Sequence, residues 1–219
     1  MFDFIKIGQV PKTSWSSEET LNFKPRLKTL TALVLGLVLF GFGEALLVAS
    51  QIGVSPWTAL GQGLSNVLGL GLGLTTFLIS IVVLFLWIPL KQKPGIGTFL
   101  NAIIISLVLH YAIPFLPIFE ENMFRLGQAI LGVFITGIGG GIYLIANLGP
   151  GARDGLMTGL QRVTNFPIAG VRSCIEISVL TIGWWFGGVI GLGTIIFALG
   201  IGPCLAISLT IFGTRKSKR

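Results

Sequence analysis

Two carboxyl groups, those of Glu44 and Glu176, fall inside long apolar stretches of the sequence. A charged residue at the centre of a spanning helix costs about 2.5 to 3.5 kcal/mol on insertion scales, so each needs a partner or a function. Glu44 is a candidate for a proton or cation site, or for contact with a polar substrate; the competing interpretation is a buried carboxyl that is hydrogen-bonded or protonated. Glu176 follows Arg172 by one helical turn, which favours a structural ion pair.

Two short polar segments interrupt the apolar chain, "IGVSPWTALGQGLSN" at 52–66 and "LGPGARDGLMTGLQR" at 148–162. Each opens with residues that end a helix: Gly53 and Pro56 in the first, and Gly149, Pro150 and Gly151 in the second. Each then continues for about a dozen residues, which is too short to span a bilayer as a helix.

The polar residues of these segments recur at helical spacing. They predict a short helix with one polar face in each segment, and leucines on the opposite face. Such a helix can lie on the membrane surface or enter the membrane as a half-helix beside a polar cavity, and an ordinary connecting loop is the third alternative. The residues of the two polar faces are Thr58, Gln62, Ser65 and Asn66, and Asp154, Thr158, Gln161 and Arg162.

Three further residues are candidates for polar contacts. Asp154 is placed to cap the second short helix, with Gly149 and Gly151 supplying the backbone freedom for the break before it. Arg153 offers a fork of donors to a carboxylate or phosphate, or marks the cytoplasmic side of the membrane. Asn101 is a candidate for an interhelical hydrogen bond or for the lining of a pore.

The sequence gives no sign of catalytic, metal or cofactor chemistry. The single histidine, His110, cannot form a metal site alone, and the two cysteines lie far apart in apolar segments. No nucleophile–base or metalloprotease motif is present, and no phosphate-binding loop follows a strand. We therefore expect no metal, no cofactor and no enzymatic activity.

The elements that position these residues are membrane-spanning helices. The 219 residues are 53% hydrophobic and 11% charged, and their mean hydropathy is +0.89, far from the composition of soluble domains. The sequence predicts an all-α, polytopic integral membrane protein with the lipid bilayer as its main partner. The six predicted crossings are Thr29–Ser50, Gly73–Leu90, Ile96–Phe115, Leu126–Ala146, Ile168–Ile190 and Gly193–Gly213.

Basic residues near the ends of the crossings all fall on one side if there are six crossings. They precede the first crossing and follow the second, fourth and sixth, whereas Glu120 and Glu121 lie on the other side. Because basic residues are retained in the cytoplasm, we expect both termini to be cytoplasmic. The same placement explains the net charge of +7 without a nucleic-acid partner.

The sequence also resembles itself when it is shifted by 96 positions. Gly36, Gly43, Gly53 and Gly63 then fall on Gly132, Gly139, Gly149 and Gly159, and Leu60 and Leu64 fall on Leu156 and Leu160. One register carries matches across three crossings, which indicates a duplication. Because three is an odd number of crossings, the second copy enters the membrane from the opposite side, as a 3+3 inverted repeat.

The expected organisation follows from this duplication. A cytoplasmic tail, without the features of a cleaved signal peptide, occupies 1–28. The first repeat occupies 29–115, an external loop 116–125, the second repeat 126–213, and a basic cytoplasmic tail 214–219.

Four stretches in this order resemble the YczE/YyaS/YitT family of bacterial membrane proteins, and its YczE-like branch in particular. They are "IGVSPWTALGQGLS", "LWIPLKQKPGIGTFLNA", "NLGPGARDGLMTGL" and "GTIIFALGIGP". The resemblance implies a multi-spanning protein of the bacterial cytoplasmic membrane; the activity of the family is not established, so the resemblance supplies no catalytic residues.

Inverted repeats, paired helix breaks and intramembrane acids are together typical of small transporters, in which the substrate binds where the repeats meet. We therefore expect a transporter or permease for a small molecule of unknown identity. The alternative is a membrane accessory or regulatory protein that assists another enzyme or an export system. Whether the chain forms a homo-oligomer is left open.

Overall fold

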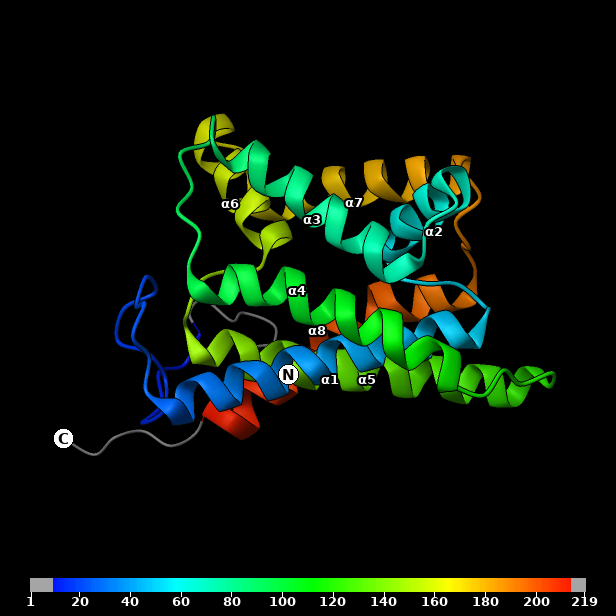
Figure 1. The fold of residues 1–219 in the computed structure, drawn as a ribbon, viewed down its shortest axis with the longest axis horizontal. Coiled ribbons are helices and arrows are strands. Elements are labelled where there is room, and N and C mark those ends of the chain that lie inside the picture. The colour runs from blue at the N-terminus through cyan, green and yellow to red at the C-terminus, as the bar shows by residue number, and fades with distance from the viewer. Residues whose placement is uncertain (1–9, 214–219) are drawn as a thin grey trace.

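The structure, a computed structural model, describes residues 10–213, and its helices form two layers (Figure 1). One layer contains α1 (Leu27–Ser50), α4 (Ile96–Ala112), α5 (Asn122–Ala146) and α8 (Leu192–Gly213). The other contains α2 (Pro56–Leu68), α3 (Leu72–Trp87), α6 (Ala152–Thr164) and α7 (Ile168–Trp185), and a short 3-10 helix, η2 (Ile113–Phe115), follows α4. No strand occurs within residues 10–213, so the predicted all-helical class is confirmed.

Helices α1 and α5 form the most extensive helix pair, and glycines bring their backbones together. A Cβ atom at Gly36 or Gly139 would lie 2.9 or 2.5 Å from the carbonyl oxygen of the other. The same holds for Gly43 and Gly132, at 2.5 and 2.7 Å. Small residues at such contacts allow close packing between membrane helices, which is why the sequence has glycine at these four positions.

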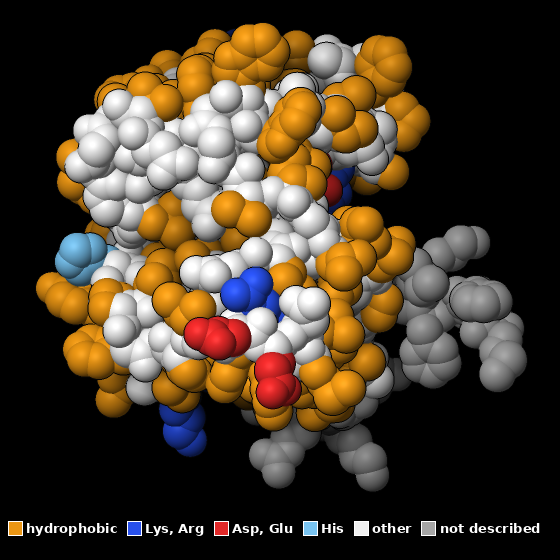
Figure 2. Space-filling view, turned by 90° about the vertical axis from the view of Figure 1, so that its right-hand side faces the viewer, with side chains coloured by type: hydrophobic (Ala, Val, Ile, Leu, Met, Phe, Trp, Pro, Cys, Tyr) orange, Lys and Arg blue, Asp and Glu red, His pale blue; other side chains and the backbone are white. Residues whose placement is uncertain are grey.

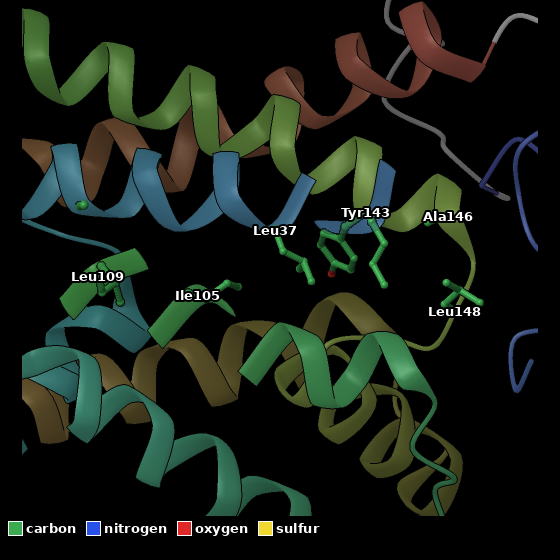
Figure 3. Close-up of a cluster of buried hydrophobic side chains, with 8 residues drawn as sticks. Leu37, Ile105, Leu109, Tyr143, Ala146 and Leu148 are labelled. Atoms are coloured by element: carbon green, nitrogen blue, oxygen red, sulfur yellow. The ribbon is translucent and has the colours of Figure 1, made fainter. Parts of the chain in front are cut away.

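A buried apolar cluster fills the space between α1, α4 and α5. Figure 3 shows Leu37 of α1, Ile105 and Leu109 of α4, and Tyr143 of α5 in this cluster. The cluster holds α4 against the α1–α5 pair, while α8 packs on the other side of α5.

In the second layer each short helix packs against a helix from the other half of the chain. Helix α6 lies against α3, where the indole Nε1–H of Trp87 donates to the carbonyl of Ala152 at 2.9 Å, and Gly155 leaves room for the indole ring. Helix α2 lies against α7, where Gly183 meets the backbone of Ala59. Both polar segments that interrupt the apolar sequence therefore contain a helix, so they are not ordinary connecting loops.

Within residues 10–213, five helices are long and apolar enough to cross a membrane: α1, α4 continued by η2, α5, α7 and α8. Helix α3 has 16 residues. With α2 it forms a pair bent by 111°, and if α2 and α3 together form one broken span, there are six spans. Three predicted boundaries were wrong. Helix α3 ends at Trp87 instead of Leu90, because Pro89 cannot continue a helix. Helix α7 ends at Trp185 instead of Ile190, shortly before Gly187, whose φ is +91°. Helix α5 begins at Asn122 instead of Leu126.

The described part of the predicted N-terminal tail packs against the membrane helices. The amide of Ser17 donates to the carbonyl of Ala146 at 3.0 Å, and Asn147 donates back to the carbonyl of Ser17 at 2.9 Å. The hydroxyl of Thr29 donates to the carbonyl of Trp15. This segment covers the end of α5. Residues 1–9 of the predicted tail and the predicted basic tail 214–219 lie outside the described residues.

Candidate functional site

A polar cavity of about 250 Å³ lies between the two layers, and all eight α-helices contribute to its lining. The outer surface in Figure 2 is mainly hydrophobic, with few charged side chains, and charged groups are visible in the notch between the layers. The polar residues that line the cavity are Glu44, Ser55, Thr76, Ser80, Asn101, Ser106, Thr136, Tyr143, Arg153, Asp154, Arg172 and Glu176.

Glu44 is the most deeply buried charged residue of the cavity, with 1% of its surface exposed. Its Oε2 atom accepts hydrogen bonds from the hydroxyls of Ser55, at 2.8 Å, and Thr58, at 2.6 Å. Both donors belong to the start of α2, whose N-terminal dipole also favours a negative charge. The Oε1 atom has no hydrogen-bond partner among the described residues. One carboxyl oxygen is thus held, and the other is available.

A second pair of a carboxyl and a hydroxyl lies at the start of α6. The Tyr143 hydroxyl donates to Oδ2 of Asp154, and Figure 3 shows the tyrosine side chain extending from α5 toward the other layer. Thr58 and Asp154 are separated by the repeat distance of 96 residues. Thr58 is bonded to Glu44 of α1, and Asp154 is bonded to Tyr143 of α5, so each short helix is bonded to the long helix before it. In the first half of the chain the carboxyl belongs to the long helix, and in the second half it belongs to the short helix.

The predicted cap by Asp154 was wrong. The residue before α6 is Gly151, and no side chain caps the helix. Asp154 lies within the first turn, where its carboxyl is favoured by the helix dipole but is bonded by the Tyr143 hydroxyl. The tyrosine comes from a different helix, so the local sequence around Asp154 gave no sign of it.

Arg153 lies beside Asp154 and above the ring of Trp57, with its guanidinium carbon 5.2 Å from the ring centre. Its charge interacts with the carboxyls of Glu44, Asp154 and Glu176. Within residues 10–213 it forms no ion pair. The indole nitrogen of Trp57 is also buried and has no described partner, so two donor groups lie together without an acceptor.

Arg172 and Glu176 form the predicted pair on α7, with Nε and Oε1 2.8 Å apart. Their side chains are 52% and 30% exposed. Both also line the cavity, so the pair contributes charge to the site, which the sequence interpretation did not foresee.

Four buried polar atoms without a described hydrogen-bond partner belong to lining residues: Glu44 Oε1, Trp57 Nε1, Thr76 Oγ1 and Ser106 Oγ. A buried polar atom left unsatisfied costs about 1 to 3 kcal/mol. Native proteins therefore pair such atoms with protein groups, water or a ligand. Their position around one cavity indicates a site that holds water or a polar ligand.

The two chain breaks that position the short helices have the same geometry. Gly53 and Gly149 adopt φ values of +120° and +116°, which side chains rarely tolerate. The carbonyl before each glycine accepts a backbone hydrogen bond from a distant helix start: Ile52 from Gly193, at 2.8 Å, and Leu148 from Gly97, at 2.7 Å.

The other predicted break residues have different roles. Pro56 is the first residue of α2, a position that favours proline. The carbonyl of Pro150 accepts a bond from Thr98 at 2.7 Å. Gly151 lies in the break as predicted, directly before α6, but it does not supply backbone freedom, since its φ of −58° is ordinary; a Cβ atom there would lie 3.3 Å from the Asn101 side chain.

Of the residues predicted for the two polar faces only Asp154 lines the cavity, and Thr58 is joined to it through its bond to Glu44. Gln62 accepts a bond from the amide of Val189 at 3.0 Å and ties α2 to the α7–α8 connection. Thr158 and Gln161 are exposed, and the Thr158 hydroxyl donates to its own helix at Gly155. The polar face of each helix is wider than its contact with the cavity, and the sequence alone does not show where that contact ends.

The leucine faces of α2 and α6 meet in a separate apolar cavity of about 580 Å³, which Leu60 and Leu156 both line. They point away from the polar cavity, as the sequence pattern predicted.

Sequence reasoning missed Ser55, Thr76, Ser106 and Tyr143 in the lining. A signal existed for Thr76, because it and Ser80 are four residues apart in an apolar helix and so share a face. Within residues 10–213 no group of three histidine, cysteine or acidic residues could hold a metal ion.

Comparison with known proteins identifies the family of the chain. A family of unknown function, DUF6198, matches residues 27–210. The chain belongs to this family. It is 38% identical over 206 residues to an uncharacterized protein of Haemophilus influenzae, an alignment that covers 94% of each chain. No solved structure matches the chain significantly.

Two relatives come from Bacillus subtilis. The uncharacterized membrane protein YczE is 33% identical over 176 residues, which cover 80% of this chain and 82% of YczE. The uncharacterized protein YyaS is 26% identical over 169 residues, 74% of this chain and 83% of YyaS. The expected resemblance is confirmed. With the apolar helices of the structure, the likeness to a membrane protein identifies the chain as a multi-pass membrane protein.

Proposed function

We propose that the protein is a transporter that moves a small polar molecule across the bacterial cytoplasmic membrane. The observation that carries the proposal is the cavity between the layers, which is lined by buried polar atoms that have no hydrogen-bond partner among the described residues. A polar cavity inside an apolar bundle is costly, and polar groups at membrane depth typically mark the path of an ion or a substrate. The starts of both short helices lie at this cavity, as in transporters with broken helices.

The packing of α1 and α5 supports an inverted repeat. Gly36 contacts Gly139, and Gly43 contacts Gly132. A shift of 96 residues converts the first contact into the second, because Gly36 becomes Gly132 and Gly43 becomes Gly139. Contacts that exchange in this way are those expected on either side of a two-fold axis between the halves.

The chain breaks give the same relation independently. A shift of 96 residues carries Ile52 to Leu148 and Gly97 to Gly193, and the two backbone bonds at the breaks join Ile52 with Gly193 and Leu148 with Gly97. Each half thus bonds the other through the same atoms. In this proposal α2 and α6 are half-helices that enter from opposite sides, and α2 with α3 forms one broken span.

The two halves differ in one respect that fits alternating access. Helix α3 packs along α4, with Gly73 directly against the backbone of Ser106. The equivalent helices, α7 and α8, make little contact in the described structure, and Gly202, equivalent to Ser106, has no neighbour within 4 Å of a Cβ position among these residues. One side of the cavity is closed by packed helices and the other is open.

The orientation follows from the ends of the molecule. The start of α1 and the α3–α4 and α5–α6 connections lie at one end in Figure 1. Lys28 and Lys93 belong to the first two of these segments, and Arg153 belongs to the first turn of α6, directly after the third, so we assign this end to the cytoplasm, with both termini. The α4–α5 connection, with Glu121, is at the other end. Cysteine labelling from outside at Lys93, but not at Glu121, would contradict the assignment. The open side between α7 and α8 then faces the cytoplasm.

The test is uptake by purified protein in liposomes. Proteoliposomes and protein-free liposomes are incubated with a bacterial metabolite extract, and the trapped compounds are compared by mass spectrometry. We expect one compound or a related set to accumulate only with protein. If no compound accumulates under any ion gradient, the transporter proposal fails and the accessory-protein alternative takes its place. Native mass spectrometry of the same preparation tests for a homo-oligomer.

A further inference from the structure

We propose that the polar cavity binds a small zwitterion, whose ammonium group contacts Glu44 and whose carboxylate contacts Arg153. This assignment rests on the proposed function, since it names the class of the transported substrate. It follows from which groups around the cavity lack partners.

The free oxygen of Glu44 calls for a hydrogen-bond donor. Oε2 already accepts two hydroxyl donors, whereas Oε1 is buried and free among the described residues. A carboxylate oxygen can only accept, so its missing partner is an N–H or O–H group. The nearby lining hydroxyls of Thr76 and Ser106 are 3% and 5% exposed and also lack described partners. An ammonium group, with three donors, can serve a carboxylate and hydroxyls together.

The guanidinium of Arg153 calls for a hydrogen-bond acceptor. A guanidinium can only donate, and Arg153 has no ion pair within residues 10–213. The indole N–H of Trp57, whose ring lies below the guanidinium, is a donor without a described partner. No side chain caps the start of α6, the helix that carries Arg153, and its dipole favours a negative charge. A carboxylate matches a planar guanidinium with two parallel hydrogen bonds.

The balance of charged side chains around the cavity argues against a ligand with a high net charge. The lining contains three carboxyls and two guanidinium groups, so neither sign dominates, as it would around a phosphate dianion or a divalent cation. Arg172 and Glu176 already satisfy each other at 2.8 Å. The volume, about 250 Å³, lies just below the usual range of about 300 to 1,000 Å³ for ligand pockets. A compact molecule with opposite charges at its two ends fits these conditions.

Binding of matched probes to the protein in lipid nanodiscs tests the assignment. L-Alanine is compared with propionate, which lacks the amine, and with ethylamine, which lacks the carboxylate. L-Leucine, 4-methylpentanoate and 3-methylbutylamine form a second series with a larger side chain. In at least one series we expect the amino acid to bind at least tenfold more tightly than both partial probes.

Two variants separate the two ends. Glu44→Gln is expected to remove the preference for the amino acid over the acid and to retain its preference over the amine. Arg153→Gln is expected to do the reverse. A purely structural role for either residue would weaken all three probes equally. If Arg153→Gln does not fold, Trp57→Phe serves in its place, because it removes the N–H donor and keeps an aromatic ring.

The outcomes are distinct from those of the uptake experiment. Equal binding of the acid or of the amine, or no binding in either series, overturns the zwitterion assignment, while uptake of another class of compound would leave transport standing. Selective binding of amino acids without uptake would support the assignment and contradict transport.

Discussion

The carboxyl group of Glu44 is held at one oxygen, and the other has no partner among the described residues. Glu44→Gln tests whether the free oxygen acts in transport. The amide oxygen of glutamine can still accept the hydroxyls of Ser55 and Thr58, so the fold should survive. The amide cannot bind a proton or carry a negative charge, so we expect the initial uptake rate to fall at least tenfold. Uptake at the full rate, with unchanged thermal stability, would make Glu44 a structural carboxyl.

Thr58 and Thr158 provide a matched pair at the residue scale. Thr58 is buried and donates to Glu44 at 2.6 Å, whereas Thr158 is exposed and bonds only its own helix. Thr58→Val keeps the shape but removes a donor from a buried carboxyl. This should lower the free energy of unfolding by about 1 to 3 kcal/mol.

Thr158→Val should change that free energy by no more than about 0.5 kcal/mol. Chemical or thermal unfolding in one detergent measures both. Equal effects would contradict the assigned hydrogen bond, and with it the held oxygen of Glu44.

At the scale of elements, the sequence predicted helices better than contacts. Apolar length and flanking glycines and prolines are local properties, so five of the six predicted crossings coincide with helices of the described residues that are long and apolar enough to cross a membrane. The direction of a polar side chain depends on what packs against its helix. Thr58 and Gln62 are one turn apart on one predicted face, yet the structure places Thr58 against Glu44 and Gln62 against the α7–α8 connection. The Tyr143–Asp154 bond joins two helices and left no local pattern.

The breaks before α2 and α6 can be tested as elements. Gly53→Ala and Gly149→Ala each place a Cβ atom at a positive φ and within 3 Å of another helix start. We expect each to cost about 1 to 3 kcal/mol in the free energy of unfolding. Gly127→Ala, in α5 with no described neighbour within 4 Å, is the control and should be neutral or slightly stabilising. Unequal costs for Gly53 and Gly149 would argue against equivalent breaks.

At the scale of the whole molecule, the proposed inverted repeat predicts what a second state would look like. In one half, α3 and α4 are packed at Gly73, Ser106 and His110; the equivalent residues in the other half are Ala169, Gly202 and Ala206. If the halves exchange conformations during transport, α7 and α8 close at these residues while α3 and α4 separate. The sequence alone could indicate the equivalence, but which half is open is a property of the packed structure.

A cysteine pair at Ala169 and Ala206, with Cys174 and Cys204 replaced by alanine, tests this exchange. A disulfide needs Cβ atoms about 3.5 to 4.5 Å apart, so the pair should form one only when α7 and α8 close. We expect an oxidant to link the pair in membranes and to stop uptake. Reduction of the disulfide should reverse both effects. Each single-cysteine variant should keep its uptake under oxidant. A disulfide that forms fully without slowing uptake would show that closure between α7 and α8 is no part of the cycle, because a transporter locked in one state cannot expose its cavity to both sides in turn.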